Sequence, residues 1–260
     1  MAEGDTIHRN ARRLGSALGA RPLLSVEAPS PRSPVRRQTG RARALVGRRL
    51  ERAEAHGKHL FLRFEGELTL HCHQGMRGSW QVYEPGAAWR KPRRAAWVVL
   101  EVESSTAVEF DGSRVAIRTE GELRRDPAIR ALGPDLLAPG FASSTGMAAL
   151  RRRASGSDQL GDALLDQTVI AGIGNIFKSE GCFAAGVDPW RTLRSLDDAE
   201  LDRVVAETAG LMGSAVLGGH APHRVYGRRG APCPRCGTAI EARGQGDANR
   251  TTYWCPGCQG

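Results

Sequence analysis

The chain has 260 residues, enough for two ordinary domains with separate hydrophobic cores. Hydrophobic residues make up 40% and charged residues 25% of it, as in soluble globular proteins, and no stretch approaches the run of about 18 apolar residues typical of a membrane helix. The first residues lack the apolar core of a signal peptide, so we expect a cytoplasmic, nucleoid-associated protein. The net charge of +9 favours an anionic partner, nucleic acid before any other.

The chain opens with "MAEGDTIHRN", in which two acidic residues lie beside the amino terminus of a basic protein. A helix is predicted directly after Asp5, with Asp5 as its cap and an apolar face formed by Ile7, Ala11, Leu14 and Leu18. This helix would tie the terminus to an ordered element. The segment 27–43 that follows is rich in Pro, Ser and Arg, which predicts a surface loop.

Alternating apolar and polar residues then predict successive strands over residues 45–73, with turns at Gly57 and at 65–67. Further strands are predicted within the segments 95–104, 106–112 and 114–121. We therefore expect a β-rich amino-terminal domain over residues 1–123.

The strand pattern stops where Pro and Gly become frequent, which predicts a linker at residues 124–140. Residues 141–222 have helical periodicity, with the segments 147–154, 158–167, 175–186 and 197–216 as the expected helices. Asp197 or Asp198 is the expected cap of the last of them. Residues 223–260 contain too many Cys, Gly and turn residues for a helix.

Two C-x-x-C pairs close the chain, formed by Cys233 with Cys236 and by Cys255 with Cys258. Four thiolates complete a tetrahedron around Zn²⁺, and a structural site needs no open coordination position. A disulfide pairing is the alternative, but cytosolic thiols are normally reduced. Redox chemistry is another, although it does not require two matched pairs. One structural Zn²⁺ is the prediction, holding a small two-stranded hairpin that carries Arg250.

The segment "ALLDQTVIAGIGNIFKSE" (163–180) predicts a helix, a turn containing Gly172 and Gly174, and a second helix that starts at Asn175. The N–H groups at such a helix start form an anion site suited to a DNA phosphate. A nucleotide-binding glycine loop is a weaker interpretation, because no G-x-G-x-x-G follows a strand. A plain helical hairpin is the structural alternative.

Together, "MAEGDT", "GKHLFLRF", "LLDQTVIAGIGNIFKSE" and the zinc-finger end resemble the formamidopyrimidine-DNA glycosylase/endonuclease VIII family, in particular endonuclease VIII of the actinobacterial type. The resemblance spans nearly the whole chain. It implies an α+β multidomain fold: an amino-terminal β-sandwich that carries a catalytic terminus, a helix–two-turns–helix domain and a zinc-ribbon hairpin. It also implies a monomer that binds damaged DNA, duplex or single-stranded, in a basic cleft between its lobes.

The resemblance also implies catalytic roles. Ala2 would become the amino terminus after Met removal, and its amine would attack C1′ of the damaged nucleotide. Glu3 matches the adjacent glutamate that assists sugar opening and proton transfer, and Lys58 matches a lysine that reaches the DNA phosphate and the reaction centre. Arg250 matches the zinc-finger arginine that holds the phosphate beside the lesion, so it belongs to both the catalytic and the DNA-binding set.

Three further DNA-binding residues follow from the same resemblance. Asn175 matches a phosphate-contacting asparagine. Met76 lies where the family inserts a wedge into the gap left by the flipped base, and Arg77 flanks it. Taken singly, these site residues have ordinary structural interpretations: a helix cap for Asn175, a core residue for Met76 and a solvated surface cation for Lys58 or Arg250. Their joint placement favours function.

The chain departs from the family pattern at its start, where Ala2 replaces the usual proline and Thr6 occupies the region of a second carboxylate. The segment 110–121 also has no clear match to the Arg–Phe loop of the 8-oxoguanine branch. We therefore expect a bifunctional glycosylase and abasic-site lyase that favours oxidised pyrimidines. A lesion- or abasic-site-binding protein without chemistry and a zinc-ribbon nucleic-acid module are the rivals.

Overall fold

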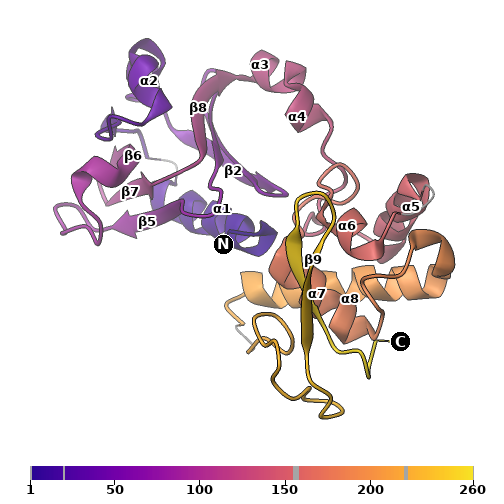
Figure 1. The fold of residues 1–260 in the computed structure, drawn as a ribbon. Helices are drawn as coiled ribbons and strands as arrows, with labels where there is room; N and C mark the ends of the chain where they lie inside the picture. Colours follow the sequence, from indigo (N-terminus) through magenta and orange to yellow (C-terminus); the bar gives the residue numbers. More distant parts are fainter. Residues whose placement is uncertain (1, 20, 155–157, 220–221, 260) are drawn as a thin grey trace. The chain divides into compact units, whose positions relative to one another are not determined.

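The computed structural model describes residues 2–19, 21–154, 158–219 and 222–259, and the chain forms two compact units, residues 1–130 and 131–260 (Figure 1). Each unit has its own hydrophobic core. Within the described ranges, no helix combines the length and the hydropathy needed to cross a membrane.

The first unit contains two antiparallel four-stranded sheets, as the sequence predicts for its β-rich half. One sheet has the order β1-β6-β7-β5, with strands Ser25–Glu27, Ala96–Val102, Ser105–Phe110 and Ser79–Tyr83. The other has the order β2-β3-β4-β8, with strands Leu50–His56, His59–Phe64, Leu68–His73 and Arg114–Thr119. The sequence pattern does not predict the short strands β1 and β5.

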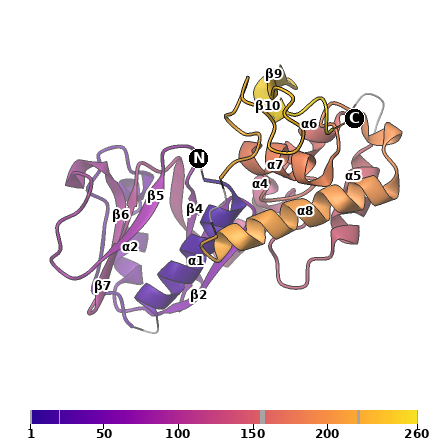
Figure 2. The same ribbon diagram turned by 90° about the horizontal axis from the view of Figure 1, so that it is seen from below.

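Helix α1, Gly4–Leu18, packs against β2 and β3 and contributes to the main core of this unit (Figure 2). The predicted apolar face is confirmed, because its four residues are buried: Ile7, Ala11, Leu14 and Leu18. Side chains from both sheets, such as Leu62 on β3 and Leu100 on β6, belong to the same hydrophobic core as this face of α1.

The predicted cap of α1 is wrong. Glu3, not Asp5, occupies the N-cap position, and its carbonyl oxygen accepts hydrogen bonds from the backbone N–H groups of Thr6 and Ile7. Asp5 lies one residue inside the helix, where its carboxylate pairs with Arg9 at 3.4 Å. The helix therefore begins immediately after the acidic residue that the family resemblance places in the reaction.

The segment 27–43 is not the surface loop that its composition predicts. It contains the 3-10 turn η1, Pro34–Arg37, and the first part of helix α2, Thr39–Leu45. Long-range hydrogen bonds stabilise them, because the Gln38 side chain bonds both the N–H and the C=O of Ile117 on β8. Strand β8 is the edge of its sheet, so Gln38 satisfies backbone groups that would otherwise face solvent.

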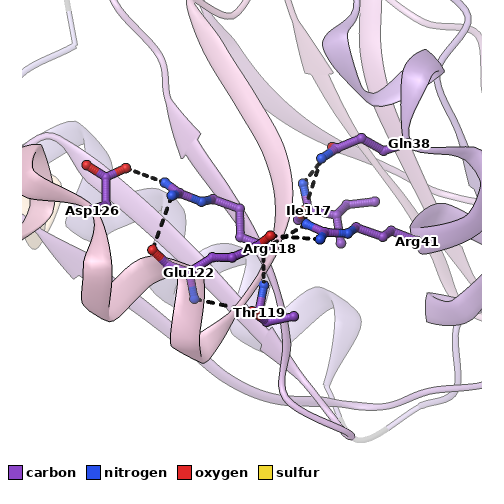
Figure 3. A network of polar contacts seen from close by, with 7 residues as sticks. All are labelled: Gln38, Arg41, Ile117, Arg118, Thr119, Glu122 and Asp126. Atoms are coloured by element: carbon purple, nitrogen blue, oxygen red, sulfur yellow. Dashed lines mark hydrogen bonds and ion pairs between the residues drawn. The ribbon is translucent and has the colours of Figure 1, made fainter.

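Figure 3 shows that the hydrogen bonds between Gln38 and β8 are part of a larger polar network at the end of this strand. Arg41 donates to the Ile117 carbonyl oxygen and to both carboxylate oxygens of Glu122, each at 2.8 Å. Glu122 lies in helix α3, Glu120–Arg125. The N-cap residue Thr119 and Glu122 form a capping box at the start of this helix. The network therefore fixes the path from β8 into α3 and the following α4, Pro127–Arg130.

This network predicts an acid-sensitive contribution to stability. The hydrogen bond from Arg41 holds the pKa of Glu122 at about 2, below its ordinary value of 4.5, so the stabilisation is complete above pH 4.5 and is lost as the pH falls toward 2. We expect Glu122→Gln to lower the urea midpoint of the first unit at pH 6 and to lower it less at pH 3.5. Glu103→Gln, an exposed change, is the control; equal effects of E122Q at both pH values would contradict the assignment.

The second unit begins with helices, as predicted. Helix α5 spans Ser143–Arg153, α6 Leu160–Leu165, α7 Asn175–Ala185 and α8 Asp198–Val216, with the 3-10 turn η3 at Leu193–Ser195. Helices α7 and α8 pack side by side, and their buried faces share one core. Asp197 caps α8 through a capping box with Glu200, which confirms one of the two expected caps.

A two-stranded antiparallel hairpin follows, formed by β9, Glu241–Gln245, and β10, Arg250–Trp254. This confirms the hairpin that the sequence predicts between the two C-x-x-C pairs. Strand β10 packs against α7, so the hairpin and the helical part form one unit (Figure 1).

Candidate functional site

The amino-terminal end of α1 lies at one end of the sheet β2-β3-β4-β8. Gly15 approaches Ala53 in the middle of β2, whereas Asn10 Nδ2 donates to Gln74 Oε1 at 3.0 Å, just beyond the end of β4. A helix rises 1.5 Å per residue, so the turns ahead of Asn10 extend further in the same direction. The start of the chain is therefore positioned at this end of the sheet.

The first described residues are anchored rather than loose. Ala2 packs against the main core of the unit, and Glu3 is only 1% exposed. A terminal amine on Ala2 would have a restricted orientation, because Ala2 packs against the core and helix α1 begins two residues later. Residues 2 and 3 are therefore not part of an exposed tail.

Lys58 occupies the turn between β2 and β3, next to Gly57, whose φ is 56°. The register pairs His59 with His73, so this turn lies beside the last residue of β4. Burial lowers the pKa of His73, and the Lys58 ammonium lowers it further. Lys58 therefore lies at the same end of the sheet as the start of α1.

The predicted wedge residues form a tight loop after β4. The N–H of Gly78 donates to the carbonyl oxygen of Gln74 at 3.2 Å, and Gly75 has a φ of 64°. Met76 at the loop tip is 68% exposed, an unusual position for a large apolar side chain, and Arg77 beside it is also exposed. The ordinary interpretation of Met76 as a core residue is thus excluded.

Histidines lie near this end on the face of the sheet that points away from the main core, a feature that sequence reasoning missed. His59 Nδ1 and His71 Nε2 are 2.9 Å apart, and the two rings stack at 5.2 Å. Burial, with repulsion from neighbouring cations and histidines, lowers the pKa of His59 to about 3 and that of His71 to about 4. Both are neutral near pH 7, so the positive charge of this end comes from lysine and arginine side chains, among them Lys58, Arg77 and Arg114.

In the second unit the structure brings two predicted residues, Asn175 and Arg250, together although they are 75 positions apart in the chain. Asn175 is the first residue of α7, and its Nδ2 donates to the carbonyl oxygen of Thr251 at 2.7 Å. Arg250, the neighbour of Thr251, is exposed at the start of β10. A helix start and an exposed cation are thus held on one surface, an arrangement whose charge suits an anion.

The position of this surface depends on buried polar residues that the sequence analysis did not single out. Lys178 is fully buried on α7, and its Nζ donates to Thr252 Oγ1 at 2.6 Å. Thr252 Oγ1 donates in turn to Gln245 Oε1 at 2.6 Å. A fully buried lysine is rare unless it is paired. The sequence does not reveal that Lys178 is buried. These contacts fix both strands of the hairpin against α7.

Glu180 makes a second link that the sequence analysis missed. Its carboxylate accepts hydrogen bonds from the backbone N–H groups of Arg224, Val225 and Tyr226, at 2.8–3.1 Å. The segment that enters the hairpin is therefore held to α7 before the first cysteine pair. The "KSE" of the helix contributes both the Lys178 and the Glu180 contacts.

The four predicted cysteines converge. Their Sγ atoms lie within 4.8 Å of one another, with Cys233–Cys258 at 3.8 Å and Cys236–Cys255 at 3.5 Å. A tetrahedral Zn²⁺ with Zn–S bonds of about 2.3 Å needs sulfur spacings of about 3.8 Å, so the residues fit the ion. The Thr238 hydroxyl helps to lower the pKa of Cys236 to about 6, which favours the thiolate that zinc binds. This is one structural zinc site.

Comparisons with known proteins agree with this geometry. The sequence matches the formamidopyrimidine-DNA glycosylase N-terminal domain over residues 1–118, its H2TH domain over residues 132–224, and the zinc finger found in FPG and IleRS over residues 230–260. The three matches cover almost the whole chain.

Curated relatives align over the full chain. A probable endonuclease 8 2 of Streptomyces coelicolor is 40% identical, with 94% of its own length covered. The DNA-(apurinic or apyrimidinic site) lyase Nei2 of Mycolicibacterium smegmatis is 34% identical, with 99% covered, and endonuclease 8 of Escherichia coli K12 is 30% identical, with 100% covered.

Solved structures share the fold. Lactococcus lactis Fpg in complex with abasic-site DNA superposes with a TM-score of 0.84 at 21% identity, covering 99% of each chain. The same protein in complex with DNA containing an oxidised pyrimidine gives 0.83 at 20% identity, again over 99% of each chain.

A two-sheet domain with an anchored amino terminus, a helix–two-turns–helix unit and a four-cysteine zinc hairpin define a class of DNA-repair glycosylases. The chain belongs to the formamidopyrimidine-DNA glycosylase/endonuclease VIII family, as its resemblance predicts.

Proposed function

We propose that this protein is a bifunctional DNA glycosylase and abasic-site lyase of base-excision repair, with oxidised pyrimidines as its favoured substrates. The observation that carries the proposal is the anchored start of the chain. Ala2 and Glu3 lie at the end of the sheet that also holds Lys58 and the exposed Met76. A nucleophile, a proton carrier, a cation and a wedge are the groups that this chemistry requires.

In the proposed reaction the free amine of Ala2 attacks C1′ of the damaged nucleotide. The N–C1′ bond forms, the glycosidic bond breaks, and the base leaves with a proton. An α-amine has an ordinary pKa near 8, so a useful neutral fraction exists at cellular pH. Alanine has a primary amine, so its imine must be protonated before it can accept electrons.

Glu3 is the proposed proton carrier. A carboxylate one residue from the nucleophile is placed to assist the opening of the sugar ring and to accept the proton that leaves C2′. Loss of that proton and cleavage of the C3′–O bond constitute β-elimination, which breaks the strand. The N-cap position of Glu3 fixes its backbone relative to Ala2.

DNA contacts complete the proposal. Lys58 would hold a phosphate near the reaction centre, while Asn175 and Arg250 would hold phosphates beside the lesion. Met76 would fill the gap left by the flipped base, and extrusion costs least for a damaged, poorly paired base. The proposed preference for pyrimidines rests on two departures from the family pattern: Thr6 in the region of a second carboxylate, and the turn 111–113, whose three residues supply no Arg–Phe loop.

Borohydride trapping tests the chemistry. A duplex with one abasic site is incubated with protein whose initiator Met has been removed, and the imine is reduced to a stable adduct. We expect mass spectrometry to locate the adduct on Ala2, and release of 5-hydroxycytosine to exceed release of 8-oxoguanine from matched duplexes.

Other outcomes separate the rival functions. An adduct on Lys58 would retain the lyase but change its nucleophile. No adduct, with selective binding of an abasic analogue intact, would favour a lesion-binding protein, a reading that the replacement of the family proline by Ala2 supports. Binding without any lesion preference would leave only a nucleic-acid module.

A further inference from the structure

A carboxylic acid lies in the core of the first unit and forms no ion pair with any of the described residues. Glu109 is on β7, where it faces Trp80 on β5 and Val98 on β6, and its residue exposure is 0%. Neither carboxyl oxygen has a hydrogen-bond partner among the described residues. Burial raises the pKa of Glu109 well above its ordinary value, because an isolated carboxylate is costly in an apolar core.

The Glu109 carboxyl lies against the turn that joins β7 to β8. A methyl group placed on Gly112 would come within 2.1 Å of Glu109 Oε1, so the carboxyl fills the space that a side chain would need there. The Lys91 ammonium and the N–H of Gly112, which faces the same carboxyl, partly offset the effect of burial on its pKa. Gly112 and Glu109 thus fit each other closely.

The other side of the turn supports the wedge loop. Ser113 Oγ donates to the carbonyl oxygen of His73 at 2.7 Å, and the Ser113 N–H reaches the same oxygen at 3.3 Å. A Cβ on Gly75 would lie 2.8 Å from that of Ser113. The turn therefore contacts both the residue before the loop and the residue that precedes Met76.

We propose that Glu109 is a positioning residue for base extrusion: its carboxyl supports the turn 111–113 through Gly112, and that turn holds the Met76 loop through Ser113. The inference rests on the proposed role of Met76 as the wedge. The segment 110–121 supplies no Arg–Phe loop to support the wedge loop. We assign that support to Glu109, which acts through the turn 111–113.

Substitutions of Glu109 can separate the effect of its side-chain volume from the effect of its polar end. Glu109→Gln keeps the size and a polar end toward Gly112, so it should preserve the loop. Glu109→Leu keeps most of the volume but leaves the Gly112 N–H facing an apolar group. Gly112→Ala perturbs the same contact from the turn, because its methyl group collides with the carboxyl.

Insertion of the wedge is measured with 2-aminopurine placed next to a tetrahydrofuran abasic analogue in a duplex, because unstacking raises its fluorescence. Met76→Ala should remove most of the fluorescence increase. Glu109→Leu and Gly112→Ala should each remove at least half of it at saturating protein, while Glu109→Gln stays within a fifth of the wild type.

Two controls separate the possible failures. Leu100→Ala opens a cavity on β6 in the same core and should lower Tm without changing the fluorescence, which distinguishes positioning from general destabilisation. If Met76→Ala has no effect, the wedge assignment fails. If Met76→Ala acts but folded Glu109→Leu and Gly112→Ala do not, or if Glu109→Gln is as damaging as Glu109→Leu, the role proposed for Glu109 is overturned.

Discussion

A chain that carries any extension ahead of Ala2 is expected to bind a lesion duplex normally and to lose base excision by roughly three orders of magnitude or more, the scale on which enzymes respond to loss of a nucleophile. An extension converts the amine to an amide, whose nitrogen is not nucleophilic. The fold of the unit rests on the core that α1 forms with both sheets, so the extension should leave it intact.

The experiment uses a fusion with a protease site that releases Ala2 as the first residue. The uncleaved and cleaved forms share every other residue, so each serves as the matched control for the other. Single-turnover excision and binding of an abasic analogue are measured on both. Full activity of the uncleaved fusion would rule out the terminal amine and direct attention to Lys58.

Removal of zinc is expected to unfold the hairpin and to abolish tight lesion binding. Zinc binding to small structural sites supplies on the order of 10 kcal/mol, more than a two-stranded hairpin gains from its own contacts. Its loss should release Thr251 from Asn175 and free Arg250 from its fixed position. The first unit has a separate core and should remain folded.

Cys255→Ser and chelation both test this prediction, with Cys182→Ala, a buried cysteine outside the cluster, as the control. Tryptophan emission reports the docked hairpin, because Trp254 on β10 packs against Trp190 at 5.2 Å. We expect the loss of zinc, the change in emission and the loss of binding to occur together. Unchanged affinity after complete zinc removal would show that the hairpin has no part in DNA binding.

Several features could be predicted from the sequence because they depend on local spacing. Two matched C-x-x-C pairs identify a zinc site, since the ligand geometry of the metal is fixed. The apolar face of α1 follows from helical periodicity, and the start of α7 at Asn175 follows from the glycine turn before it. The family resemblance added roles to residues, such as Glu3 and Met76, whose types alone do not indicate function.

The local rules also produced two errors. The segment 27–43 has the residues of a loop, but Gln38 and Arg41 bind the edge of β8 some 76 to 79 positions away and hold helical turns in place. These contacts are not visible in a window of neighbouring residues. Asp5 has the chemistry of a cap, but Glu3 is the N-cap and the helix begins at Gly4.

By itself, the sequence determined the zinc ligands, the helical and strand-rich halves and the family, because periodicity, cysteine spacing and motif order are properties of the chain. Only the tertiary structure decided which polar groups are buried and what they support. Lys178 holds the hairpin to α7, and Glu109 lies beneath the turn that contacts the wedge loop. Burial changes the cost of a charge by several kcal/mol, and it depends on segments that meet only when the chain folds.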